Sequence, residues 1–327
     1  MRDRELIGNI LSSAARKGKA MSVHEYLTSF AGVPVVEFSD DDPGSVTGGK
    51  VAWAIRSEYG GESFEAVFGR FLETVDPGEV THLVFGYWGA GYETSSAGPL
   101  RLLVDAAPRL PKLKAVFFGD ILMEEDEISW ITQCDVTPLL TAYPGLERLD
   151  VRGGNGLVLS PLSSTALKVL RIESGGLPAA VVRAIGASDL PNLRTLELWL
   201  GIEDYGGNAT VADLAGILGG EKLPALSRLG LMDSEIQDEI CAAMAAAPIV
   251  ARLSEVALSM GVLTDDGAEA LLSGQPLGHL RELDLQHHYL TDPIVARLRA
   301  ALPQVRLLIG EAQKDDDPGW RYVAVSE

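Results

Sequence analysis

The feature that most constrains the fold is an apolar spacing, leucine-x-x-leucine-x-leucine, that recurs along most of the chain. Eight copies begin at Val80, Leu113, Leu146, Leu167, Leu193, Leu226, Leu253 and Leu280, and a truncated copy has Val305 and Leu308. Neighbouring copies lie between 21 residues apart, from Leu146 to Leu167, and 33 residues apart, from Val80 to Leu113. A period in this range indicates a solenoid, in which each unit buries its apolar edge against the next unit.

Each copy predicts a short strand followed by a helix. Residues two apart in a strand point to the same face, so the last two leucines of a copy face the core and their neighbours face outward. Helix start signals follow the strands: Ser63, Thr137 with Pro138, Pro178, Thr210 with Asp213, Ser234 with Gln237 as a capping box, and Thr291 with Pro293. The sequence therefore predicts an α/β fold with a curved parallel sheet inside and helices outside.

This pattern resembles leucine-rich-repeat proteins with long helical repeats, of the ribonuclease-inhibitor type, and residues 253–292 carry the resemblance best. The stretches GDILMEEDEISWITQCDVTPLL, LELWLGIEDYGG and SEIQDEICAA also resemble an uncharacterised bacterial cytoplasmic leucine-rich-repeat family. The resemblance implies a horseshoe-shaped solenoid that serves as a binding scaffold.

One departure from this repeat family concerns the residue that leaves each strand, where Asn or Cys is usual. The chain has Trp88, Ile121, Gly154, Gly175, Gly201, Ser234, Gly261 and His288 at these positions. Glycine can adopt positive φ in a tight exit, so we expect varied turns along this edge.

The domain organisation follows from where the repeats begin and end. We expect a flexible extension over residues 1–20, a capping unit over 21–79, the repeats over 80–310, and an acidic tail or cap over 311–327. In the capping unit, Pro34 to Phe38 and Val51 to Ile55 read as strands of a hairpin. In the tail, WRYVAV is predicted to dock as a final strand.

Charge and cysteine content exclude several classes of partner and site. The chain has 27 Lys and Arg against 46 Asp and Glu, a net charge of −19, which disfavours nucleic acids and membrane surfaces. Its 2 cysteines are far apart, which fits a reducing cytoplasm and no zinc ribbon. We expect no cofactor, because phosphate-binding, zinc-protease and serine-hydrolase motifs are absent from the sequence.

An enzymatic alternative depends on the densest acidic run, Glu124 to Glu127, together with Asp120 and His82. Carboxylates can act as general acids, as bases or as ligands of Mg²⁺. The competing interpretation is a solvated insert or a helix N-terminus. His279, His287 and His288 lack acidic or thiol partners at ligand spacing, so no metal site is predicted.

The favoured interpretation is a non-catalytic protein that binds a protein partner and is a monomer on its own. One candidate surface is the outward register of the strands, and the other is the aromatic rim formed by the loops that leave them. The first surface comprises Arg148, Asp150, Arg152, Arg171, Glu173, Glu197, Trp199 and Met232, and the second comprises Trp88, Trp130, Tyr205 and His287. Given the acidic chain, the partner is expected to present a basic contact surface.

Overall fold

The computed structural model describes residues 24–39, 50–89, 94–314 and 320–327. The predicted extension 1–20 and both acidic turns, at Asp40 to Gly44 and Asp315 to Gly319, lie outside these residues.

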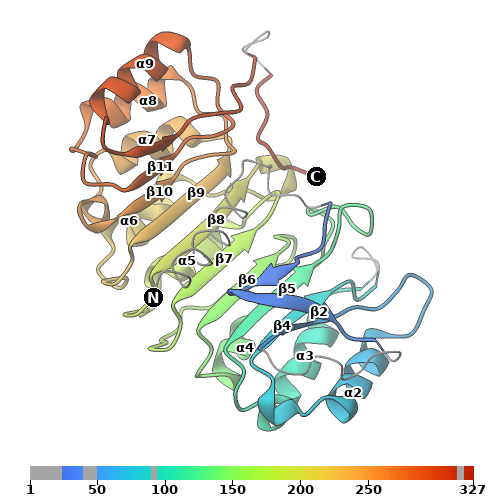
Figure 1. Ribbon diagram of the computed structural model, residues 1–327. Coiled ribbons are helices and arrows are strands. Elements are labelled where there is room, and N and C mark those ends of the chain that lie inside the picture. The colour runs from blue at the N-terminus through green and yellow to red at the C-terminus, as the bar shows by residue number, and fades with distance from the viewer. Residues whose placement is uncertain (1–23, 40–49, 90–93, 315–319) are drawn as a thin grey trace, which may run out of the picture.

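The described residues form an α/β protein around one twelve-stranded sheet whose strands follow the order of the chain (Figure 1). Strand β1 is antiparallel to β2, and all the other neighbouring strands are parallel. The strands are β1 Ser29–Phe30, β2 Val33–Glu37, β3 Ala52–Ile55, β4 His82–Gly86, β5 Ala115–Asp120, β6 Arg148–Arg152, β7 Val169–Glu173, β8 Thr195–Gly201, β9 Arg228–Ser234, β10 Glu255–Ala257, β11 Glu282–Asp284 and β12 Arg306–Leu308.

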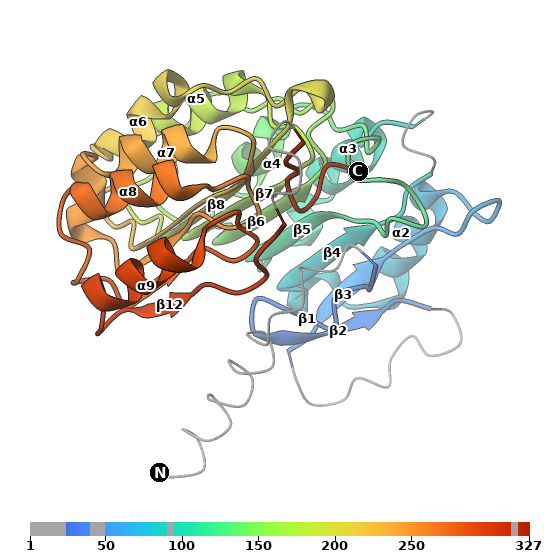
Figure 2. The same cartoon turned by 90° about the horizontal axis from the view of Figure 1, so that it is seen from above.

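The helices lie along the outer side of the curved sheet, and the strands line its inner side (Figure 2). The α-helices are α2 Phe64–Thr74, α3 Ala97–Asp105, α4 Thr137–Ala142, α5 Ala179–Ala187, α6 Ala215–Gly219, α7 Gln237–Met244, α8 Asp265–Ser273 and α9 Asp292–Ala301. Short 3₁₀ helices add η1 Pro77–Glu79, η2 Ala107–Arg109, η3 Glu203–Tyr205, η4 Val211–Leu214 and η5 Pro248–Arg252. This arrangement is that of a curved, solenoid-like fold, in agreement with the predicted fold class.

The predicted register is confirmed in the central strands. Leu149 lies opposite Leu170, Leu170 opposite Leu196, and Leu196 opposite Leu229. None of these side chains is more than 2% exposed, because each fills a layer between two neighbouring units.

At the last strand the predicted register is wrong by one residue. Leu307, not Leu308, lies opposite Leu283, and Leu307 and Ile309 pack against the core. The turn before this strand is like the preceding one, since Val305 donates to the carbonyl of Leu302 as Leu280 does to that of Leu277. β12 then begins one residue after Val305, whereas β11 begins two residues after Leu280, so the stub has lost one residue.

The N-terminal cap also differs from the prediction. Strands β2 and β3, which were expected to form a hairpin, run parallel and join the main sheet. The antiparallel hairpin forms instead between β1 and β2. It folds Phe30 over the inner face of the sheet, against Phe117 at a ring distance of 6.0 Å.

Helix capping follows the sequence signals in part. Ser63 accepts from the amide of Ala66 at the start of α2, and Thr210 and Asp213 form the capping box of η4. The predicted box of Ser234 and Gln237 is wrong. Ser234 is the last residue of β9, and the Gln237 amide donates instead to the carbonyl of Leu231.

The strand exits are less uniform than glycine content predicted. Gly201 has the expected positive φ of 68°, but Gly154, Gly175 and Gly261 do not. These three are required by close approach instead. A Cβ on Gly175, for example, would lie 2.3 Å from the carbonyl oxygen of Ser326.

Candidate functional site

The inner face of strands β6 to β12 carries a continuous set of ion pairs, which we call the ion-pair row. Apart from Arg281, which precedes β11, its members come from equivalent outward positions, because side chains on neighbouring parallel strands stack in register. They are Arg148, Asp150, Arg152, Arg171, Glu173, Glu197, Arg228, Glu255, Arg281, Glu282 and Arg306.

Arg228 is the centre of the row. Its Nε lies 2.6 Å from Glu197 Oε1, its Nη1 lies 2.7 Å from Glu255 Oε2, and the same Nη1 lies 3.5 Å from Glu282 Oε1. The side chain is 31% exposed, so it is paired and still reaches solvent. The guanidinium fork can satisfy several carboxylates at once, which makes the centre of the row rigid.

The electrostatics of the row keep its acids ionised at the centre. Burial alone would raise the pKa of Glu197, but Arg171 and Arg228 outweigh it and lower that pKa below its ordinary value. Glu173 has its pKa lowered in the same way, by Arg171 and Arg152. Asp150 differs, because burial raises its pKa despite the hydrogen bonds from Arg148.

Accessibility divides the predicted inner-face residues into two groups. Arg148, Arg171 and Glu197 are half-buried and reach solvent. Asp150, Arg152 and Glu173 are buried, and their charges are satisfied internally, Arg152 by Glu173 at 2.7 Å. The reachable part of the row is therefore Arg148, Arg171 and Glu197, continued on β9 to β12 by Arg228 and its partners.

Trp199 and Met232, predicted as an exposed anchor and its neighbour, are both buried. Trp199 is 0% exposed and packs with Ile128, Met232 and Ala257, and Val325 packs against the same cluster. The prediction that Trp199 is exposed is therefore wrong, because two segments that are distant in the sequence cover its side chain. Its indole lies under Arg171, with the guanidinium carbon 5.9 Å from the ring centroid.

The aromatic rim is only partly as predicted. Trp88 is buried and stacks on Phe118 at 5.4 Å, so its predicted place on the surface is wrong. Trp130 is 51% exposed, as a rim contact requires. Tyr205 donates its hydroxyl to Glu327, which with burial raises the pKa of Tyr205 to about 12. His287 donates from Nε2 to the carbonyl of Tyr322 at 3.0 Å.

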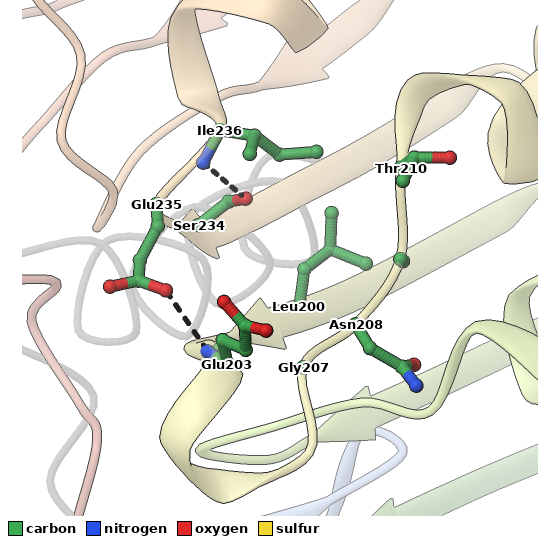
Figure 3. Close-up of a pocket in the computed structure, with 10 residues that line it drawn as sticks. Leu200, Glu203, Gly207, Asn208, Thr210, Ser234, Glu235 and Ile236 are labelled. Carbon is green, nitrogen blue, oxygen red and sulfur yellow. Dashed lines mark hydrogen bonds between the residues drawn. The ribbon is translucent and has the colours of Figure 1, made fainter.

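A pocket of about 250 Å³ lies between the loops that follow β8 and β9, which the sequence did not reveal (Figure 3). Glu203 and Glu235 border it, and the Glu203 amide donates to Glu235 Oε2 at 2.9 Å. Asn208 also lines it, and its Oδ1 accepts from the amide of Ala179. Among the described residues that line the pocket none is cationic, so the two exposed carboxylates give it a negative character.

His82 lies apart from the other residues of the enzymatic alternative, whereas Asp120 and Glu125 both contact residues 26–27. His82 begins β4 opposite Ala115, whereas Asp120 ends β5 opposite Gly86, at the other edge of the sheet. Asp120 is fully buried and lies 2.7 Å from Arg56.

The acidic insert is engaged by the N-terminal segment. Glu124 lies 3.0 Å from His24, and Tyr26 donates to Glu125. No group of three or more metal-ligating side chains occurs within the part of the chain that the structure describes.

Comparisons with known proteins identify a relative by structure. No protein-family model matches the chain, and no match is found among curated proteins. A crystal structure of a Bacteroides fragilis protein, determined as a structural-genomics target, is similar with a TM-score of 0.73 and 31% identity. The alignment covers 80% of this chain and 73% of that one.

The fold and its charged inner face define a solenoid-like α/β protein, and the chain belongs to the family of the Bacteroides fragilis protein. Within the described residues, no helix is long and apolar enough to cross a membrane.

Proposed function

We propose that this protein is a non-catalytic recognition or scaffold protein of the leucine-rich-repeat type, which binds a protein partner on its concave face or on the rim at the carboxyl ends of the strands. The repeat assignment is supported by the alignment of Leu149, Leu170, Leu196 and Leu229 across four strands. The curvature of the sheet and the outer position of the helices suit a horseshoe (Figure 2).

The observation that carries the proposal is the partly exposed centre of the ion-pair row, where the side chains of Glu197 and Arg171 are 14% and 15% exposed and that of Arg228 is 31% exposed. A solenoid needs only its core layers to be stable, so a purely solubilising face would carry scattered charges. Here Arg171 and Arg228 are fixed by Glu197 from both sides, Arg171 Nε lying 3.5 Å from its Oε2. Such pre-organised arginines lose little side-chain entropy on binding, which favours them as contact residues.

The nature of the partner follows from charge. The net charge of −19 attracts a partner with a basic contact surface, and added salt should slow their association. Within that surface, acidic side chains of the partner pair with Arg171 and Arg228. We propose that the protein acts in the cytoplasm, without a cofactor, and is a monomer until the partner binds.

The proposal is tested by affinity capture from native cell extract with three versions of the chain. Arg228→Glu reverses the charge at the centre of the row. Arg297→Glu is the matched control, because Arg297 pairs with Glu269 on the outer helices. A protein retained by the wild type and by Arg297→Glu but lost with Arg228→Glu supports the proposal. Equal retention by all three versions contradicts binding through the concave face, and retention of no protein by any version contradicts the recognition function.

A further inference from the structure

The C-terminal residues 320–327 return across the edge formed by the strand ends, where the dark red trace lies near the exits of the central strands (Figures 1 and 2). Along the segment, Tyr322 contacts the loop after β11, Ala324 the loop after β10 and Val325 the end of β9. Ser326 then contacts the insert after β5, and Glu327 contacts the loop after β8. The prediction that WRYVAV docks as a final strand is wrong: residues 320–327 follow the edge of the sheet outside regular secondary structure, with a bend at Ala324. We call the surface beneath them the tail groove.

The tail groove binds its occupant mainly through the main chain of residues 322–326. The amide of Tyr322 donates to the Tyr289 hydroxyl at 2.8 Å, and its carbonyl accepts from His287. The amide of Ala324 donates to the carbonyl of Met260 at 2.7 Å. The amide of Val325 donates to Asp233 Oδ1 at 3.0 Å, and Ser129 donates to the carbonyl of Ser326. Contacts of this kind hold the backbone of a peptide whatever its side chains are, so selectivity must come from side-chain subsites.

One subsite of the tail groove is selective. The Val325 side chain packs against the cluster of Ile128, Trp199, Met232 and Ala257, with Met260 beside it. This lining is apolar and nearly dry, so an aliphatic side chain fits it and a charged one would be expensive to bury. Val323 is another aliphatic side chain of the segment and is buried, at 8% exposed, whereas Trp320 is 67% exposed and Tyr322 is 63% exposed.

The backbone of the tail groove is strained at the places where it holds the segment. Asp233, Met260 and His287 occupy equivalent positions in three successive repeat units, and the backbone φ of each lies between 54° and 71°. Such left-handed φ is costly for residues other than glycine and clusters at functional sites. Asp233 is also fully buried, and its Oδ2 has no hydrogen-bond partner among the described residues. Because Gly175 has no side chain, Ser129 and the carbonyl of Ser326 can approach each other beside it.

From these contacts we infer that the tail groove is a binding site for an extended peptide with a small aliphatic residue, and that residues 320–327 occupy it in the place of a partner segment. The inference deepens the proposed recognition function, on which it rests, by naming the class of partner at the rim. A partner peptide must displace the segment, and Trp199 loses part of its cover when it does.

The test uses the full chain and a fluorescently labelled peptide of sequence WRYVAVSE. The tethered segment has an effective concentration of about 1 mM, so the wild type should bind the free peptide roughly tenfold or more weakly than a chain whose own segment cannot compete. Val325→Asp supplies that chain, because it places a charge in the apolar subsite. A labelled peptide carrying the same change, WRYVADSE, is the matched control and should bind neither chain.

A second version protects the test against misfolding of Val325→Asp. A protease site in place of residues 315–319 lets the segment be cut from the folded wild-type chain, and labelled peptide should then exchange into the groove. Failure of the peptide to bind the folded Val325→Asp chain, or to exchange into the cut chain, overturns the inference. Equal binding of WRYVAVSE and WRYVADSE also overturns it.

The two proposals can fail separately. Arg228→Glu lies outside the tail groove and should leave peptide affinity unchanged. Partner capture that depends on Arg228, without any peptide binding, would contradict the inference about the tail groove and support the concave site. Peptide binding without any captured partner would contradict the concave site and support the inference about the tail groove.

Discussion

Replacing Leu196 by alanine tests whether the repeat leucines hold the solenoid together. Leu196 is 0% exposed and lies between Leu170 and Leu229 in one core layer. The change removes three carbon atoms from water-free surroundings, which costs about 2.4 kcal/mol at roughly 0.8 kcal/mol for each. The remaining cavity adds to this, because both neighbours belong to rigid strands and cannot collapse. We expect a total loss of about 3 to 4 kcal/mol in the free energy of unfolding.

Thr195→Ala is the matched control on the same strand. Thr195 precedes Leu196, points to the opposite face and is partly exposed, so the change should cost no more than about 0.5 kcal/mol. Urea titration followed by circular dichroism measures both variants. Equal losses for the two variants would refute the reasoning, because the leucine would then fill no core layer.

Three further changes test the site. Trp199→Ala should destabilise the fold by about 3 to 5 kcal/mol in urea titration, because the indole is fully buried, and a loss under 1 kcal/mol would contradict its place in the core. Glu197→Gln should cost about 1.5 to 3 kcal/mol at neutral pH, because it removes the ion pair with Arg171 and weakens the charged hydrogen bond from Arg228. The pKa of Glu197 is lowered in the folded state, so this difference from the wild type should vanish as pH falls through that pKa, and a difference that persists in acid would count against the ion pairs. Burial raises the pKa of Asp233 well above its ordinary value, so the stability of the wild type relative to Asp233→Asn should fall as pH rises from about 4 toward neutrality. Thermal melts measure this difference, and melting temperatures of the two proteins that change equally with pH would contradict it.

The repeated strands could be predicted from the sequence because their signal is local and periodic. In the copies that begin at Leu146, Leu167, Leu193 and Leu280, the two core positions flank a charged residue, and this alternation sets which side chains enter the core. The same argument placed Arg148, Arg171 and Glu197 on the inner face. It did not extend to β12, where one missing residue before Arg306 shifts the register without changing the apolar pattern.

The burial of Trp199 could not be predicted, because what covers it comes from far away in the chain. Ile128 belongs to an insert after β5, and Val325 to the C-terminal segment, and neither segment follows the repeat. The burial of Trp88 could not be predicted either, although the residue that covers it is nearer in the chain. Trp88 leaves β4 where a rim residue is expected, yet it turns inward and stacks on Phe118 of the next strand.

The most direct test of the central claim is a calorimetric titration of the captured partner into the wild type, Arg228→Glu and Arg297→Glu. Because Arg228 joins three carboxylates at the reachable centre of the ion-pair row, we expect Arg228→Glu to weaken binding by about 2 kcal/mol or more, roughly 30-fold in Kd. Arg297→Glu on the outer helix α9 should bind like the wild type. Equal affinity of Arg228→Glu and the wild type would contradict recognition through the concave face.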